Sequence, residues 1–198
     1  MHPTLLTVVA RADSRALRTA ERLGAVAFVT ALTAVAAQIS VPLPFTPVPL
    51  TFQAMAVLVG GAALGSRLGM ASQVLYLALG IAGLPVFAAS PTLAPGPARL
   101  LGPTGGYLMA YPLAAFVTGW LAERGFDRRY VTAVAAMSCG LAVVFAGGVL
   151  WLARVVQPVS AALAAGFYPF IVEDVIKLLV AGAVMPGLWR LTRFRTEN

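Results

Sequence analysis

The run that decides the fold is residues 130–153, which read YVTAVAAMSCGLAVVFAGGVLWLA. It contains no charged side chain, and a helix needs about 20 apolar residues to cross the ~30 Å hydrocarbon core of a bilayer. The whole chain of 198 residues has this character, with 60% apolar and 11% charged residues. A soluble domain has about half apolar and about a quarter charged residues, and a chain this small buries only about two thirds of its surface. The surplus apolar surface therefore predicts an integral membrane protein.

Five further apolar runs are long enough to be considered as membrane spans. Because backbone N–H and C=O groups find no partner in lipid, each crossing is expected to be helical. The fold prediction is therefore an all-α integral membrane protein with six transmembrane helices. Two runs, 52–66 and 107–122, are short for a full crossing, so five or seven spans stay open as alternatives. The other predicted spans are 23–41, 68–88, 130–153 and 170–189.

Arginine is distributed unevenly over this predicted topology. An even number of spans puts both termini on one side of the membrane, and eleven arginines fall on that side against two on the other. Since basic residues favour cytoplasmic loops, both termini are expected in the cytoplasm. We therefore divide the chain into a cytoplasmic segment 1–22, with a surface helix as one option, a six-helix membrane domain 23–189 and a cytoplasmic tail 190–198. The eleven arginines are Arg11, Arg15, Arg18, Arg22, Arg67, Arg124, Arg128, Arg129, Arg190, Arg193 and Arg195, and the other two are Arg99 and Arg154.

Tryptophan placement agrees with this orientation. Trp120 and Trp189 fall near the cytoplasmic interface and Trp151 near the outer one, where aromatic residues are enriched. Ala34-Val35-Ala36 has the small-residue pattern of a signal-peptide cleavage site. The basic segment before the first apolar run is long for a signal peptide, so we expect that span to be retained.

Several kinds of chemistry lack the residues that they need. His2 is the only histidine and Cys139 the only cysteine, which excludes an HExxH zinc site, a Ser-His dyad and a disulfide scaffold. The single lysine, Lys177, does not stand in a Walker A motif, so energy for uphill transport would come from a partner or a gradient. We expect no metal, no cofactor and no nucleic-acid partner. An intramembrane enzyme that uses Glu173 or Asp174 as a general base is the less favoured alternative.

The segments expected on the outer side are rigid. Residues 41–51 contain four prolines, and residues 89–106 are rich in proline and glycine. A stretch so rich in proline is stiff and extended instead of helical. Such apolar, rigid loops suit the wall or lid of a pocket, and the alternative is that they only connect helices.

The last predicted span carries three ionisable residues, in the run Pro169-Phe170-Ile171-Val172-Glu173-Asp174-Val175-Ile176-Lys177. Each charge at the bilayer centre costs about 2.5–3.5 kcal/mol, and less near the interface. Asp174 and Glu173 lie three and four residues before Lys177, so they share a helix face with it. The group is either an internal ion pair or a ligand site, and intramembrane charges usually mark the latter. Gln53, directly after the proline-rich segment, makes either a helix–helix hydrogen bond or a ligand contact.

These segments together resemble the BioY family, the substrate-binding integral-membrane component (S component) of biotin transporters of the energy-coupling-factor type. The likeness covers about residues 20–190. One departure is Glu173, where the family tends to have a small residue. The matching blocks are Pro44-Phe45-Thr46-Pro47-Val48-Pro49-Leu50-Thr51-Phe52-Gln53, Gly80 with Gly83-Leu84-Pro85-Val86-Phe87, Gly102-Pro103-Thr104-Gly105-Gly106-Tyr107-Leu108, and Pro169-Phe170 with Asp174 and Lys177.

The resemblance implies biotin uptake across the bacterial inner membrane by a six-helix S component with its pocket near the extracytoplasmic side. It also implies docking through Ala27 and Ala31 on a transmembrane coupling subunit, which would carry two ABC-type ATPases. Transport of another vitamin or small heterocycle is the alternative. The expected ligand-binding residues are Asp174, Lys177, Arg99, Gln53, Phe45, Phe52, Phe87, Tyr107 and Phe170.

The chemistry of biotin suits those side chains. An ionised Asp174 only accepts hydrogen bonds and matches the two N–H groups of the ureido ring, whereas Lys177 only donates. Arg99 is the candidate for the ligand carboxylate, which a guanidinium can bind in bidentate fashion. The five aromatic residues among the expected set would line the apolar part of the pocket.

Overall fold

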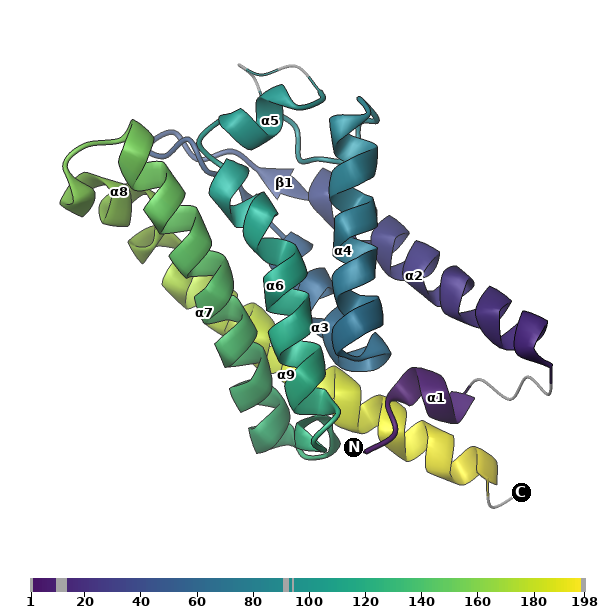
Figure 1. Cartoon of the computed structure of the whole chain (residues 1–198). Helices are drawn as coiled ribbons and strands as arrows, with labels where there is room; N and C mark the ends of the chain where they lie inside the picture. The colour runs from purple at the N-terminus through teal and green to yellow at the C-terminus, as the bar shows by residue number, and fades with distance from the viewer. Residues whose placement is uncertain (1, 10–13, 91–92, 94, 197–198) are drawn as a thin grey trace.

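The structure is a computed structural model that describes residues 2–9, 14–90, 93 and 95–196, so Arg11 lies outside the described residues. One main helix overlaps each of the six predicted spans, in the predicted order. Figure 1 shows these helices side by side, with both chain ends at one end of the bundle. The main helices are α2 (Arg15–Gln38), α3 (Gln53–Leu64), α4 (Ser66–Ile81), α6 (Gly105–Ala122), α7 (Tyr130–Val155) and α9 (Tyr168–Thr196).

Shorter elements join them. Helix α1 (Leu5–Val9) precedes α2, while α5 (Ala98–Leu101) and α8 (Val159–Gly166) lie at the end of the bundle opposite the termini (Figure 1). A 3-10 turn, η1 (Phe126–Arg128), joins α6 to α7. Among the described residues, α2 and α7 have the length and apolarity of helices that cross a membrane.

Helix α6 forms the centre of the bundle, where it packs against α7, α4 and α3. Small residues permit these close approaches: a Cβ atom at Gly61 on α3 would lie 2.5 Å from the carbonyl oxygen of Ala115 on α6. Helix α9 packs against α7 and α3, and α2 packs against α3 and α4. The core between them is apolar and includes Val57, Leu58, Tyr76, Ala114, Met137, Leu152, Ala181 and Met185.

The second predicted span is a half-helix. Helix α3 has 12 residues and so rises only about 18 Å, less than the ~30 Å of a hydrocarbon core. The chain before it is extended, and two short strands, β1 (Ser40–Val41) and β2 (Leu50–Thr51), pair antiparallel with Ser40 opposite Thr51. Irregular backbone is tolerated at membrane depth where it is enclosed by protein or lines a cavity. The short apolar run at 52–66 is explained by this arrangement.

Three helix ends differ from the predicted boundaries. Helix α4 ends at Ile81 and not near 88, because Gly83 adopts a positive φ of 95° and Pro85 follows it. Helix α2 is continuous from Arg15, with Ser14 accepting a hydrogen bond from the backbone N–H of Leu17, so the chain has no break near residue 22. Helix α9 continues past residue 189 to Thr196.

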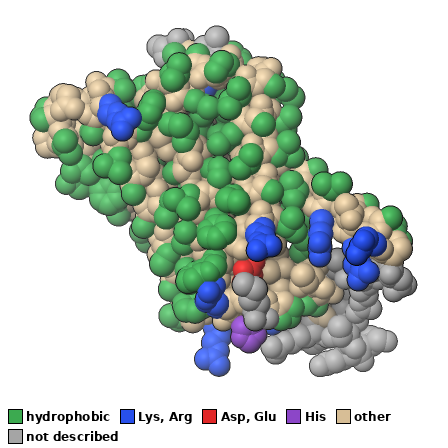
Figure 2. All heavy atoms as spheres, in the orientation of Figure 1, with side chains coloured by type: hydrophobic (Ala, Val, Ile, Leu, Met, Phe, Trp, Pro, Cys, Tyr) green, Lys and Arg blue, Asp and Glu red, His purple; other side chains and the backbone are tan. Residues whose placement is uncertain are grey.

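Basic side chains gather at one end of the bundle. In Figure 2 most of the visible Lys and Arg side chains lie toward the end that carries both termini, while the rest of this face is largely hydrophobic. That end also includes the α3–α4 corner and η1. The arrangement agrees with an even number of crossings and with a cytoplasmic location for both termini.

Trp189 does not act as the interfacial anchor that the sequence suggested. Its side chain is buried, and its indole N–H donates to Oδ2 of Asp127 at 2.6 Å. The Arg128 guanidinium carbon lies 3.5 Å from the centre of the Trp189 ring. Burial raises the pKa of Asp127, while the contacts with Trp189 and Arg128 oppose that shift. Trp120, in contrast, is 41% exposed, as an interfacial aromatic residue should be.

We predict that Trp189→Phe destabilises the protein by about 1.5–3 kcal/mol, because a buried hydrogen bond to a charged acceptor is lost. The measurement is reversible unfolding in mixed detergent micelles. Trp120→Phe is the matched control, because the Trp120 ring is exposed and the cation described against it is the Arg124 guanidinium. This substitution should lower the free energy of unfolding by no more than about 1 kcal/mol. Equal losses for the two variants would contradict the role given to Asp127.

Candidate ligand-binding site

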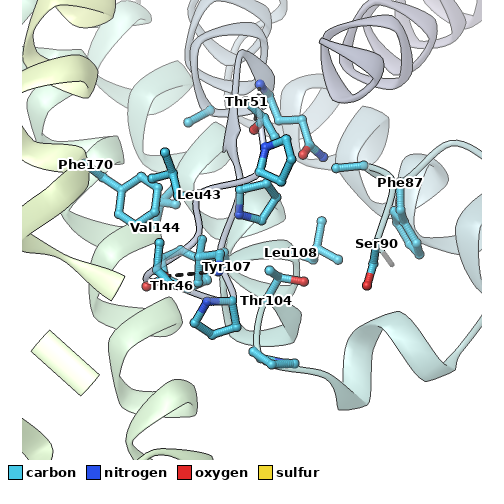
Figure 3. A pocket seen from close by; sticks show the side chains of 18 of the residues that line it. Leu43, Thr46, Thr51, Phe87, Ser90, Thr104, Tyr107, Leu108, Val144 and Phe170 are labelled. Atoms are coloured by element: carbon cyan, nitrogen blue, oxygen red, sulfur yellow. Dashed lines mark hydrogen bonds between the residues drawn. The ribbon is translucent and has the colours of Figure 1, made fainter. Parts of the chain in front are cut away.

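A cavity of about 270 Å³ lies at the end of the bundle opposite the termini. Figure 3 shows side chains from four parts of the chain that point toward this space. Its walls are the proline-rich segment 42–51, the loop from Phe87 to Thr104, the outer half of α6 with part of α7, and the first turns of α9. This volume is close to the lower bound of about 300 Å³ for small-molecule pockets.

Seven of the nine residues predicted to bind a ligand line this cavity. They come from positions 53 to 177 of the chain and lie on four helices, α3, α5, α6 and α9, and on the loop between α4 and α5. Residues 42, 43, 46–49 and 51 line the cavity as well, so the proline-rich segment forms a wall of a pocket, as the sequence suggested, and does not merely connect helices. The seven residues are Gln53, Phe87, Arg99, Tyr107, Phe170, Asp174 and Lys177.

The other two predicted residues, Phe45 and Phe52, are not among the residues that line the cavity. Phe45 stands 66% exposed in the bend between β1 and β2. Phe52 precedes α3 and is 43% exposed, while its neighbour Gln53 is buried and takes the inward position. The Phe52 ring instead lies beside the charged cluster, with its centre 4.9 Å from Nζ of Lys177.

The charged residues of α9 form one cluster on the cavity wall. The Lys177 ammonium donates to the backbone carbonyl of Thr51 and pairs with Oε1 of Glu173. Oδ1 of Asp174 lies 3.6 Å from the same ammonium. Lys177 is 8% exposed, so its charge sits away from bulk water and needs these partners. Lys177 thus joins α9 to the extended segment before α3.

Arg99 contributes a second cation to the cavity from α5, on the loop side. Its side chain is buried, and this burial lowers the pKa of the guanidinium. An arginine nevertheless stays charged in proteins. The cavity is thus lined by two carboxylates and two cations among the residues that the structure describes.

Gln53 both joins helices and lines the cavity, so the two alternatives raised for it are compatible. Its amide Nε2 donates to the Tyr76 hydroxyl at 2.6 Å, and that hydroxyl donates to the backbone carbonyl of Val86 at 3.0 Å. The Phe87 ring packs edge-on against Tyr76, with centres 5.3 Å apart. It lies so close to Gly80 that a Cβ atom there would be 2.0 Å from it. This chain of contacts positions the loop that carries Phe87.

Two hydroxyl groups hold the corner between α8 and α9. Thr46 donates to the carbonyl of Ala165 at 2.5 Å, and Tyr107 donates to the carbonyl of Gly166 at 2.6 Å. The Thr46 hydroxyl also accepts from the backbone N–H of Val48 at 3.2 Å. The first turns of α9 are therefore fixed against both the proline-rich segment and α6.

Sequence reasoning missed several lining residues with polar groups. Tyr111 follows Tyr107 by four residues on α6, so the helical period would have placed both on one face. Thr46 and Thr51 are the hydroxyl-bearing residues of the proline-rich segment, and the prolines drew attention away from them. Ser90 and Thr104 also line the cavity. Thr104 stands in one of the blocks that resemble the BioY family, whereas nothing in the sequence distinguishes Ser90 from an ordinary loop residue.

The fold and this site define a helical membrane protein with a preformed cavity for a small molecule. Residues 10–194 match the BioY family. A probable biotin transporter BioY of Pyrococcus horikoshii is 43% identical over 162 residues, which cover 82% of this chain and 92% of that protein. The biotin transporter BioY of Thermotoga maritima is 40% identical with the same coverage. This chain therefore belongs to the BioY family.

A solved structure has the same fold. The crystal structure of the S-component for biotin from an ECF-type ABC transporter matches this chain with a TM-score of 0.79 and 27% sequence identity. The match covers 90% of this chain and 95% of that one. The six-helix architecture expected from the apolar runs is confirmed by this match together with the helix order.

We predict that Tyr76→Phe destabilises the protein by about 1–3 kcal/mol, because it leaves the Gln53 amide and the Val86 carbonyl without their shared partner. Thermal unfolding in detergent measures the loss, and hydrogen exchange should rise across residues 82–90. Tyr130→Phe is the control, since Tyr130 is 44% exposed at the start of α7. Unchanged exchange in that loop would show that Tyr76 does not position it.

Proposed function

We propose that this protein binds biotin in the cavity described above and serves as the substrate-binding component of a biotin uptake system. The observation that carries the proposal is the clustering of Asp174, Lys177 and Arg99 around one small, otherwise apolar cavity. The names of the relatives in Pyrococcus horikoshii and Thermotoga maritima support it.

The polar groups of the cavity complement those of biotin. Asp174 accepts the ureido N–H groups, and charge-assisted hydrogen bonds of this kind are about twice as strong as neutral ones. Lys177 and Arg99 donate to the ureido and carboxylate oxygens. Tyr107, Phe87 and Phe170 line the apolar part of the cavity and suit the thioether ring and the aliphatic tail.

The transport role includes partner subunits in this proposal, since the sequence contains no Walker A motif. We propose that a transmembrane coupling subunit docks on α2 and carries two ABC-type ATPases, while this chain binds biotin without covalent chemistry or a cofactor. Ala27 and Ala31 are exposed on α2, next to the exposed apolar side chains of Phe28, Leu32 and Val35. Small residues in such a face allow a second helix to approach closely. The proposed location is the bacterial inner membrane, with both termini in the cytoplasm.

We predict that Asp174→Asn weakens biotin binding by about 10- to 100-fold, the equivalent of losing a hydrogen bond to a charged acceptor. Isothermal titration of the purified protein measures the dissociation constant, and thermal unfolding checks that the variant is folded. Glu21→Gln is the control, because Glu21 lies on α2, which contributes no residue to the described cavity wall. A dissociation constant unchanged by Asp174→Asn would count against this residue, and stronger binding of another vitamin in a competition panel would favour the alternative substrate.

For the docking surface, we predict that Ala31→Trp abolishes co-purification of the coupling subunit while biotin still binds. The bulky ring would hold the partner helix away from α2. Ala135→Trp is the matched control, because Ala135 is an exposed alanine on α7. Native mass spectrometry reports the bound subunits and the bound vitamin together. Equal retention of the subunit by both variants would move the docking surface away from α2.

A further inference from the structure

The cavity holds its charges in balance before a ligand arrives. Among the described residues that line it, Glu173 and Asp174 are the carboxylates, and Lys177 and Arg99 are the cations. At neutral pH these four groups sum to zero formal charge. The lining tyrosines, Tyr107 and Tyr111 from α6, are neutral near pH 7 and add nothing to this sum.

The other elements packed around Glu173 bring no further charge to it. The proline-rich segment 42–51 has no ionisable side chain, and neither does α3 or α8. Val144 and Phe145 are the residues that α7 contributes to the wall, and both are apolar. Tyr168, which precedes the cluster on α9, is 60% exposed and is not among the residues that line the cavity. Tyr76 lies behind Gln53 and keeps its hydroxyl on Val86.

A monoanionic ligand disturbs that balance. The carboxyl group of biotin is ionised near pH 7, since aliphatic carboxylic acids have a pKa of about 4. Its arrival leaves the cavity with one uncompensated negative charge, and an unpaired charge away from water costs several kcal/mol. Lys177 and Arg99 already carry protons, so they cannot neutralise it. The site can restore neutrality by taking up a proton on one of its two carboxylates.

Glu173 is the carboxylate suited to accept that proton. Its Oε2 atom is buried and has no hydrogen-bond partner among the described residues, whereas Oε1 pairs with Lys177. Asp174 is assigned to the two ureido N–H groups, and only its ionised form offers both oxygens as acceptors to them. When the ligand carboxylate supplies a new counter-ion for the cations, Lys177 no longer needs both of its acidic neighbours.

We propose that Glu173 is a proton-binding site, and that biotin enters the cavity together with one proton. The inference rests on the proposed function, because it takes biotin as the anionic ligand. Linkage then fixes the pH dependence: where one proton is taken up, the dissociation constant rises about tenfold for each unit of increasing pH. Biotinamide, which lacks the charge, should bind without this dependence.

The test is titration calorimetry of the full-length protein with biotin in phosphate and in Tris, whose ionisation enthalpies differ. Uptake of about one proton by the wild-type protein, with no uptake for biotinamide or in Glu173→Gln, supports the proposal. Glu21→Gln is the control and should take up the proton as the wild type does. The biotin affinity of Glu173→Gln should also be equal at pH 6.5 and pH 8.5, values chosen to bracket neutrality at about pH 7.

Three results would overturn the proposal. Biotin binding by the wild type with the same heat in both buffers would remove proton uptake and leave the proposed function intact. Undiminished proton uptake in Glu173→Gln would assign the proton to another group. Absence of any biotin binding would overturn the proposed function and this inference together. The biotinamide comparison uses only wild-type protein, so an equal heat difference between the buffers for biotin and biotinamide overturns coupled proton uptake even if Glu173→Gln fails to fold. A Glu173→Asp variant, which keeps the carboxylate, then tests the assignment to Glu173: it should retain the proton uptake.

Discussion

The buried ammonium group of Lys177 has to be paired, and this need organises the end of the helix bundle that holds the cavity. Lys177 lies on a helix that belongs to the membrane domain, and its buried charge is held by the Thr51 carbonyl, Glu173 and Asp174. If Lys177 paired only with residues of α9, nothing in this cluster would hold the extended segment before α3 in place. Because Thr51 takes part, the charge requirement also positions the backbone that enters α3. A wall of the cavity is thus built by the same contacts that make the lysine tolerable.

The extended segment has a second requirement, since it lacks the internal hydrogen bonds of a helix. Short pairing between β1 and β2 satisfies part of its backbone, and four prolines remove N–H groups that would otherwise need acceptors. Thr46 then ties the bend to the carbonyl of Ala165. Irregular backbone is stable here because side chains and carbonyls of the protein surround it.

The sequence was most informative where lipid imposes a strong constraint. Unbroken apolar runs predicted all six main helices, and the ionisable residues at 173–177 marked the cavity because charges in a membrane are rarely tolerated without a role. Side-chain direction in extended backbone was less predictable: Phe45 and Phe52 belong to the matching motif, yet both are exposed and are not among the residues that line the cavity. In a helix, the helical period predicts which face a side chain occupies. A segment with several prolines and a tight bend has no regular period, so the sequence could not predict the directions of these two rings.

Tertiary contacts account for the other differences. The burial of Trp189 depends on Asp127, which lies 62 positions earlier in the chain, and composition near a membrane interface gives no sign of this pairing. The half-length of α3 follows from the extended segment beside the cavity at its start and from Gly65, which ends the helix with a positive φ of 85°. Thr46, Thr51 and Tyr111 gain their importance only once the four walls of the cavity are assembled.

Helix α2 stands apart from the chemistry of the cavity, since it packs on α3 and α4 and supplies none of the described lining residues. Substitutions on the outward face of α2 therefore leave the described cavity wall unchanged, and substitutions in that wall leave the outward face unchanged. The two surfaces can evolve separately, so the proposed membrane partner and the proposed ligand can each change while the other is kept.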